Sequence, residues 1–205
     1  MTRRILAGIL GCFLTSILAI AEAPAGTAAP AGAMRAYYDE PPQCVVVLPG
    51  PIQAGIVAGG RIAAALARQL SGRVARVIHP SERGRLVRAM AVDLNHPADV
   101  RHFAAATNCP ALLRWQVLGS GHDNALVWSQ KHLSLGAEII RARDGALLWQ
   151  ATAVASRSSG DPPLSLFSLP IAILQAAAFQ ENDDTVASML DDLARRMLGS
   201  LPDLR

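Results

Sequence analysis

Apolar and polar positions change their spacing along the chain, and each change predicts a new element. Residues 45–48 form a continuous apolar run that Pro49 ends, which is typical of a short strand buried on both faces. Residues 56–70 then repeat apolar side chains at helical spacing. A second short apolar segment, 74–78, predicts another strand. The first half therefore alternates strand, helix and strand.

Two further helices are expected before the next strand. Ser81 is a candidate N-cap for a helix through Met90, and a second helix is expected over 98–107. The inner face of that second helix should carry apolar side chains at helical spacing, namely Val100, Phe103 and Ala104. A third strand is expected over 111–118, followed by a turn at 119–124, where glycine and polar residues gather.

The second half alternates apolar and polar residues over 126–141, which predicts a strand with one buried face. Asp144-Gly145 is a hairpin signal, and 146–156 should pair back as the next strand. A last helix is expected over 184–198, with acids at its start and Arg195 and Arg196 at its end, as the helix dipole favours.

The order β-α-β-α-α-β-β-β-α predicts one α/β domain over residues 43–200. The expected fold is a three-layer sandwich, in which a mixed sheet has a parallel first half and an antiparallel meander, with helices on its faces. At 205 residues the chain has room for one such domain.

The N-terminus predicts export. Residues 1–21 read as a signal peptide, with two early arginines, an apolar run and small residues before the expected cleavage site. Residues 22–42 then read as an Ala/Gly/Pro-rich tether. An alternative is lipidation at Cys12, which closes a Leu-Gly-Cys pattern, and a third reading retains the segment as an anchor. Each alternative places the domain outside the cytoplasm, in the periplasm or attached to the outer membrane.

Cysteine usage agrees with an oxidising compartment. Apart from Cys12, the chain has Cys44 and Cys109, and each stands just before an expected strand. If those strands are parallel neighbours, the two thiols lie at one end of the sheet and a disulfide is expected. Two buried free thiols are the alternative.

Composition excludes several partners. The chain is 51% hydrophobic and 17% charged, with a formal net charge of +3, and its arginines are scattered among acids. Nucleic-acid binding is therefore not expected, because no basic patch is visible in the sequence. The only lysine is Lys131, so the chain has no Gly-Lys-Ser/Thr phosphate loop.

Candidate chemistry is sparse. The glycines after the first strand lack dinucleotide-binding spacing. His122 and Asp123, with His132, are the most defensible histidine cluster, but no pair has metal-ligand spacing on a helix. Trp115, Trp128 and Trp149 are expected in cross-strand packing, with a stacking platform as the alternative. We therefore expect no catalytic residue, no metal and no cofactor.

One apolar stretch carries information about partners. Residues 164–179 are almost continuously hydrophobic but too short to span a bilayer comfortably. They either close the core or form a contact with a partner, a second copy or a membrane surface. The contact set would be Leu164, Leu166, Phe167, Leu169, Ile171, Ile173, Leu174 and Phe179.

Residues 138–150 carry a family resemblance. A strand ends in an Asp-Gly turn and the next reads apolar-apolar-Trp, as in bacterial envelope lipoproteins related to the curli secretion channel subunit and to the TolB amino-terminal domain. The Leu48-Pro49 strand end and the apolar segment before the last helix are similar as well. The resemblance implies the three-layer fold and a place in envelope assembly without catalysis. The poor lipobox at Cys12 departs from the pattern.

Two function classes follow. The first is a non-enzymatic periplasmic or outer-membrane-associated accessory protein that binds envelope or secretion partners, through 164–179 and the exposed side of the meander. The alternative is a small-ligand binding module or hydrolase that uses the loops after Leu48, Ile78 and Leu118. A pocket that holds His79 near His122 or Asp123 would favour the alternative.

Overall fold

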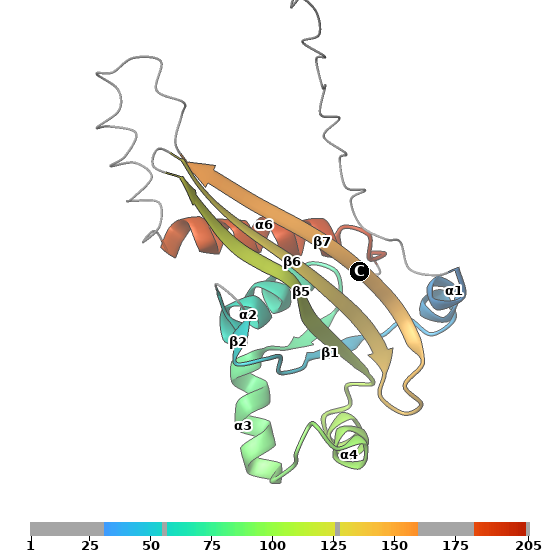
Figure 1. The fold of residues 1–205 in the computed structure, drawn as a ribbon. Coiled ribbons are helices and arrows are strands. Elements are labelled where there is room, and N and C mark those ends of the chain that lie inside the picture. Colours follow the sequence, from blue (N-terminus) through green and yellow to red (C-terminus); the bar gives the residue numbers. More distant parts are fainter. Residues whose placement is uncertain (1–30, 55–56, 126–127, 160–182, 204–205) are drawn as a thin grey trace, which may run out of the picture.

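The computed structural model describes residues 31–54, 57–125, 128–159 and 183–203. Its centre is an open five-stranded mixed sheet in the order β4-β1-β5-β6-β7, which confirms the predicted α/β class (Figure 1). The strands of this sheet are β1 (Cys44–Val47), β4 (Arg76–Ile78), β5 (Ala111–Ala125), β6 (Trp128–Arg141) and β7 (Leu147–Ser159). A separate two-stranded ribbon, β2 (Gln53–Ala54) and β3 (Val57–Ala58), follows β1.

The first half of the sheet is parallel, as predicted. β1 lies between β4 and β5, and pairs with both in parallel register. All four residues of β1 are buried, because successive side chains point into two different cores. Val45 and Val47 face one core, whereas Cys44 and Val46 face the other.

The second half is an antiparallel meander of the long strands β5, β6 and β7. The predicted turn at 119–124 is wrong, because these residues continue β5 and pair with β6 through Asn124 opposite Ser129. The β5–β6 pairing shifts its register between Val117 and Gly119, where the glycine-rich part of β5 begins. The predicted Asp144-Gly145 hairpin is confirmed, with Gly145 at a φ of +73°.

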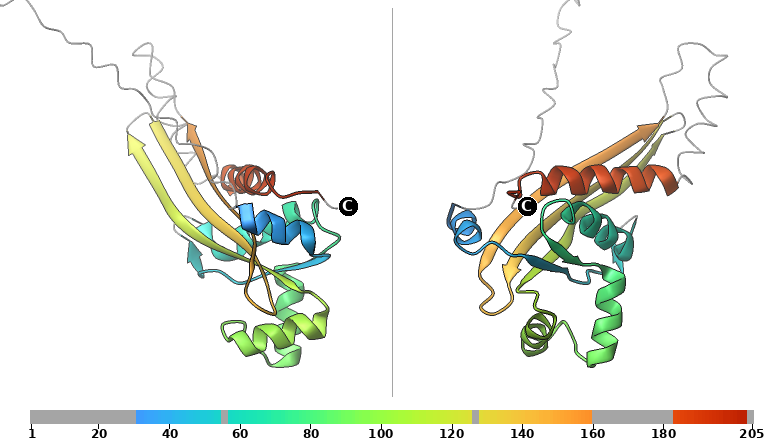
Figure 2. Two further views of the ribbon diagram at one scale, coloured as in Figure 1. Left: turned by 90° about the vertical axis from the view of Figure 1, so that its right-hand side faces the viewer. Right: turned by 180° about the vertical axis from the view of Figure 1, so that it is seen from behind.

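Helices cover the two faces of the sheet unequally (Figure 2). Three of them, α1 (Ala31–Asp39), α2 (Gly59–Leu70) and α6 (Asp183–Leu198), contribute to the larger core. On the other face, α3 (Pro80–Met90) and α4 (Pro97–Thr107) pack with the first residues of β1 and β5 in the smaller core. The sandwich thus has three layers beside the parallel half and two beside most of the meander.

Two local predictions need correction. Residues 31–39, expected within the tether, form α1, and the Tyr37 side chain is fully buried in the larger core. Packing against β7 supplies the burial that the local composition does not indicate. The N-cap of α3 is His79 rather than Ser81, since Pro80 occupies the first helical turn.

Several predictions fall outside the described residues. These are the signal peptide over 1–21, the lipidation alternative at Cys12 and the apolar segment 164–179 with its contact set. Within the described ranges, the helices are too short or too polar to cross a membrane.

Candidate functional site

The predicted disulfide is present. Cys44 begins β1 and Cys109 directly precedes β5, and their Sγ atoms are bonded across a sequence separation of 65 residues. The parallel pairing of Val45 with Ala111 explains the contact, because it places both cysteines at the same end of the sheet. Both cysteines are buried in the smaller core, where α4 contributes Phe103.

One face of the meander is the candidate site. Leu113, Leu135 and Ala153 point into the larger core, so the alternate residues of β5–β7 point to the opposite side. Beyond the smaller core, no described helix packs on this side, which we call the open face. Its side chains are those of Arg114, Gln116, Leu118, Asp123, Gln130, His132, Ser134, Glu138, Gln150, Thr152, Val154, Ser156 and Ser158, with Gly119, Gly121 and Gly136 between them.

The strand register arranges these polar residues in rows. Glu138 of β6 lies between Arg114 of β5 and Gln150 of β7. In the next row, Gly136 lies between Gln116 and Thr152. Because glycine lacks a side chain, the middle of this row is hollow.

A cavity of about 660 Å³ occupies this part of the open face. It extends from the two rows to the end of β1 and to the loop between α3 and α4. Its lining residues are Leu48, Pro49, Leu94, Asn95, Arg114, Trp115, Gln116, Gly136, Ala137, Glu138, Gln150, Ala151 and Thr152. The side chain of Leu118, in β5, lies against Gly136 of β6. A Cβ atom at Gly136 would lie 3.4 Å from the Leu118 Cδ1 atom.

The charges of the cavity balance each other. The Arg114 guanidinium and the Glu138 carboxylate are 3.8 Å apart and both about half exposed. Solvent screens a pair of this kind, so it contributes little to stability and both groups stay accessible to a ligand. The remaining polar side chains of the cavity are neutral amides and a hydroxyl, which both donate and accept hydrogen bonds.

The glycine-rich turn after β1 forms a wall of this site. The Trp115 Nε1–H donates to the Leu48 carbonyl oxygen at 3.2 Å. The indole ring then packs against Gly50, where a Cβ would lie only 2.1 Å from the Trp115 Cζ2 atom. The glycine at this position therefore serves packing of the indole, and a phosphate loop is not needed to explain it.

An arginine of α3 fixes the other side of this turn. The Arg83 guanidinium donates to the carbonyl oxygen of Val47, the last residue of β1. Burial lowers the pKa of Arg83, because the surroundings disfavour the charged form. This contact joins α3 to the strand end beside the cavity.

The structure separates the predicted histidine cluster. The His132 Nδ1 atom lies 3.6 Å from the Asp123 carboxylate on the open face. His122 lies opposite Lys131, and strand alternation places it on the other side of the sheet. The described part of the chain brings together no group of three or more histidine, cysteine or acidic side chains that could hold a metal.

His79 does not join this cluster. Its Nε2 atom is 3.0 Å from the Ser71 hydroxyl, which itself donates to the Ala67 carbonyl oxygen at 2.8 Å. The Ala67 carbonyl oxygen can only accept, so it engages the hydroxyl proton, and in this arrangement the His79 Nε2–H donates to the Ser71 oxygen. None of His79, His122 and Asp123 lines the cavity of the open face, so this cavity is not the pocket that would favour the alternative function class.

The structure shows how two of the three tryptophans pack. Trp115 and Trp149 are buried in the larger core, which confirms cross-strand packing for these two. The Trp149 Nε1–H donates to the Ser200 hydroxyl at 3.2 Å, which holds the C-terminal residues against β7. The Trp128 side chain lies outside the described set.

A second, smaller cavity of about 250 Å³ lies near the disulfide. Two of its three lining arginines form ion pairs, because Glu40 contacts Arg143 at 2.7 Å and Arg141 at 3.5 Å. These ion pairs link the end of α1 to the β6–β7 hairpin. We therefore assign this region a structural role.

The sequence predicted the β6 part of the open face but not the cavity. The alternation over 126–141 predicted that His132, Ser134 and Glu138 share a side opposite the apolar residues, and this is confirmed. Gln116, Gln150 and Thr152 went unrecognised, since the hollow exists only once three strands and the α3–α4 loop come together.

Comparisons with known proteins give limited guidance. No protein-family model and no curated protein matches the chain, so the resemblance to envelope lipoproteins stays a prediction. A PelC dodecamer from Paraburkholderia phytofirmans is 17% identical, with 88% of this chain and 96% of that chain covered at a TM-score of 0.49. Lipoprotein GNA1162 from Neisseria meningitidis is 16% identical, with 72% and 99% covered at 0.46. With TM-scores below 0.5, these likenesses assign no function to this chain.

Proposed function

We propose that this chain is a non-enzymatic accessory protein of the bacterial envelope, which binds an envelope protein partner through its open face. One observation carries the proposal. The open face is a polar, charge-balanced and hollowed surface on a sheet whose opposite face is sealed by the larger core. A rigid sheet that presents neutral amides and hydroxyls suits a partner surface of similar polarity.

The proposed location rests on two features. A leader of signal-peptide character begins the chain. The bond between Cys44 and Cys109 requires an oxidising compartment to form and persist, and the periplasm provides one. Attachment to the outer membrane through Cys12 stays an alternative within this proposal.

A non-enzymatic role is supported by the contacts of two polar side chains, Ser71 beside His79 and Glu138 in the cavity. Ser71 already donates its proton to a helix carbonyl, and the cavity carboxylate of Glu138 faces Arg114. Both side chains are therefore already engaged by neighbouring groups of the protein.

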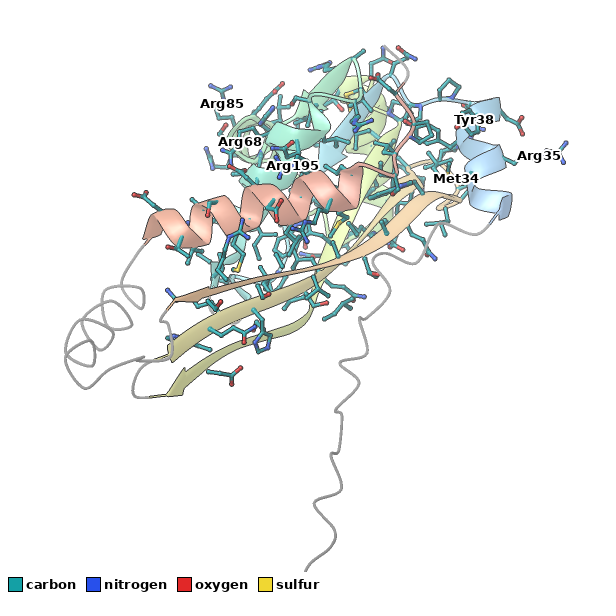
Figure 3. The ribbon with its side chains drawn as sticks, turned by 90° about the horizontal axis from the view of Figure 1, so that it is seen from above. Met34, Arg35, Tyr38, Arg68, Arg85 and Arg195 are labelled. Carbon is teal, nitrogen blue, oxygen red and sulfur yellow. A yellow bond between two sulfur atoms is a disulfide. The ribbon has the colours of Figure 1, made fainter. Side chains whose placement is uncertain are left out.

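Site-specific photocrosslinking in living cells tests the partner. A photoreactive residue at Gln116 or Gln150 should give one adduct of defined mass with an envelope protein. The matched control is Arg35 of α1, whose side chain is exposed and points away from the sheet (Figure 3). The Arg114→Glu variant, which turns the charge pair into two acids, should weaken the adduct. Equal labelling from Arg35 and from the open face would contradict the proposal.

A small polar ligand is a second candidate, because the volume of the cavity lies within the range of about 300–1,000 Å³ typical of ligand sites. It also lies beside Leu48, one of the strand ends predicted to bind a ligand. Native mass spectrometry of protein purified from its own envelope would show the extra mass, and Gln116→Trp should displace it. Turnover of an ester or glycoside that Glu138→Gln abolishes would instead indicate a hydrolase.

A further inference from the structure

β7 is the last strand of the sheet. β6 pairs with its inner edge, and no other described strand pairs with its outer edge. α1 lies beside the beginning of β7, and α6 runs alongside the rest of the strand on the side of the larger core (Figures 1 and 2). No described strand therefore bonds to the backbone N–H and C=O groups along this outer edge.

The sequence of this edge is unusual for a strand that stays unpaired. Edge strands are normally protected by proline, by charged side chains or by bulges. Residues 150–156 read Gln-Ala-Thr-Ala-Val-Ala-Ser, with no proline and no charge. The segment therefore lacks the sequence features that normally keep an edge strand from pairing with another strand.

Val154 gives the edge an apolar centre. It is 55% exposed and lies on the open face, which is otherwise polar apart from Leu118 at 51%. A β-branched side chain in a strand is stabilised by packing against a side chain of the neighbouring strand on the same face of the sheet. On the outer side of β7, no described strand supplies such a side chain.

A second β7 fits this edge in one register better than in others. An antiparallel pair centred on Val154 places Val154 opposite its copy and Thr152 opposite Ser156 of the other chain. Ala153 then lies opposite Ala155, so small side chains allow close approach on the core side. The only charge near the centre, Arg157, lies opposite Ala151, whereas a register centred on Arg157 would bring two arginines together.

We infer that β7 pairs antiparallel with β7 of a second copy, with Val154 on the two-fold axis. The interface is isologous, and it joins the two five-stranded sheets into one sheet of ten strands. The two open faces become continuous across the axis. The inference uses the strand edge and does not depend on the partner proposed for the open face.

Cysteine crosslinking tests the register. Cys44 and Cys109 are already bonded to each other, so an introduced cysteine supplies the reactive thiol. Val154→Cys should form a disulfide-linked dimer, since facing residues of an antiparallel pair lie about 4.5–5.5 Å apart, within the range of a disulfide. Thr152→Cys alone should not crosslink, but the double variant Thr152→Cys/Ser156→Cys should. Gln116→Cys, on the same face of an inner strand, is the control.

The oligomeric state of the exported full-length protein gives a second readout. We expect a dimer in sedimentation equilibrium, and Val154→Lys should raise its dissociation constant about tenfold or more, because two lysines would face each other. Gln116→Lys adds the same charge to the open face and should leave the dimer intact. A monomeric wild-type protein would overturn the inference. So would crosslinking of Val154→Cys to a different protein, or a dimer unaffected by Val154→Lys.

Discussion

The indole nitrogen of Trp115 and the carbonyl oxygen of Leu48 are joined by a hydrogen bond of 3.2 Å at the wall of the cavity. A backbone hydrogen bond from the Leu48 N–H to the Leu113 oxygen, at 2.9 Å, extends the β1–β5 pairing to the same residue. The end of β1 is therefore fixed to β5 from two directions. The shape of the cavity depends on this connection, because Leu48, just after β1, and residues of β5 both line it.

Gly50→Ala should be destabilising through this contact. Its Cβ would lie 2.1 Å from the Trp115 Cζ2 atom, so the indole or the turn must move. Overpacking of this kind costs about 1–3 kcal/mol. In a Trp115→Phe background the smaller ring lacks that atom, and the added cost of Gly50→Ala should fall below about 1 kcal/mol. Urea unfolding of the four proteins measures the coupling, and equal costs in both backgrounds would rule out this contact as the cause.

Removal of the disulfide should lower the free energy of unfolding. The bond between Cys44 and Cys109 spans 65 residues, for which loop entropy predicts about 4 kcal/mol, with about 2–4 kcal/mol typical of experiments. The double variant Cys44→Ala/Cys109→Ala should show this loss in urea unfolding. Reductant should destabilise the wild type to a similar extent and leave the variant unchanged. An insensitive wild type would indicate that the bond is absent in solution.

Local patterns predicted most elements because their periodicity coincides with burial. The last helix, expected over 184–198, is observed over 183–198, and the helix expected over 98–107 begins one residue earlier. α1 was missed since its stability depends on distant residues. Tyr37 is buried only because β7 and the C-terminal residues surround it.

The extension of β5 shows a different limit of the sequence. Gly119 to Asn124 has the composition of a turn, and such residues form turns when no neighbouring strand is available. Here β6 supplies the ladder, and the His132 ring lies over Gly121, where a Cβ would be 2.2 Å from the imidazole. The ring replaces the missing glycine side chain, which is a contact between strands that no local pattern could indicate.

Ala91→Gly should increase stability. Ala91 ends α3 in the left-handed region, at φ +51° and ψ +39°, where its N–H bonds to the Val87 oxygen. Side chains other than glycine are disfavoured in this conformation, so the substitution should gain about 0.5–1 kcal/mol. Ala89→Gly, two residues earlier inside the helix, should instead lose about 0.5–1 kcal/mol. Thermal unfolding of both variants compares the signs, and a loss for both would contradict the expected strain.

Asp192→Asn should weaken the attachment of α6 to the sheet. The nearly buried Asp192 carboxylate contacts Arg195 at 2.6 Å, Arg196 at 2.8 Å and Arg157 of β7 at 3.8 Å. At neutral pH the loss should be about 1–3 kcal/mol. Asp191→Asn is a matched control, because its partner Arg68 and Asp191 itself are both exposed and such pairs contribute less than about 1 kcal/mol.

The same carboxylate predicts an acid dependence. Burial acts to raise the pKa of Asp192, but the hydrogen bond from Arg195 and the charges of Arg196 and Arg195 outweigh it, so the pKa lies below its ordinary value of 3.8. Its contribution is thus present above pH 3.8 and is lost as the pH falls through the lower pKa of the folded state. The difference between wild type and Asp192→Asn should shrink below that pH in urea unfolding. A constant difference down to pH 2 would show that the charge is not responsible.

Tyr37 predicts a loss of stability at high pH. Burial, together with the charges of Tyr38 and Asp203, raises its pKa from 10.0 to about 12. An unfolded chain releases this proton near pH 10, whereas the folded protein retains it, so stability should fall as the pH rises from 10 through 12. Tyr37→Phe should flatten this fall and cost less than about 1 kcal/mol at pH 8, because the hydrogen bond to the Pro202 oxygen is long, at 3.5 Å. Tyr38→Phe, at an exposed position, removes a smaller cause of this shift than burial and should retain most of the wild-type slope. The free energy of unfolding measured at pH 8, 10 and 11.5 gives this slope. If Tyr37→Phe lost stability with pH as steeply as the wild type, the alkaline loss would come from another group than the buried Tyr37 phenol.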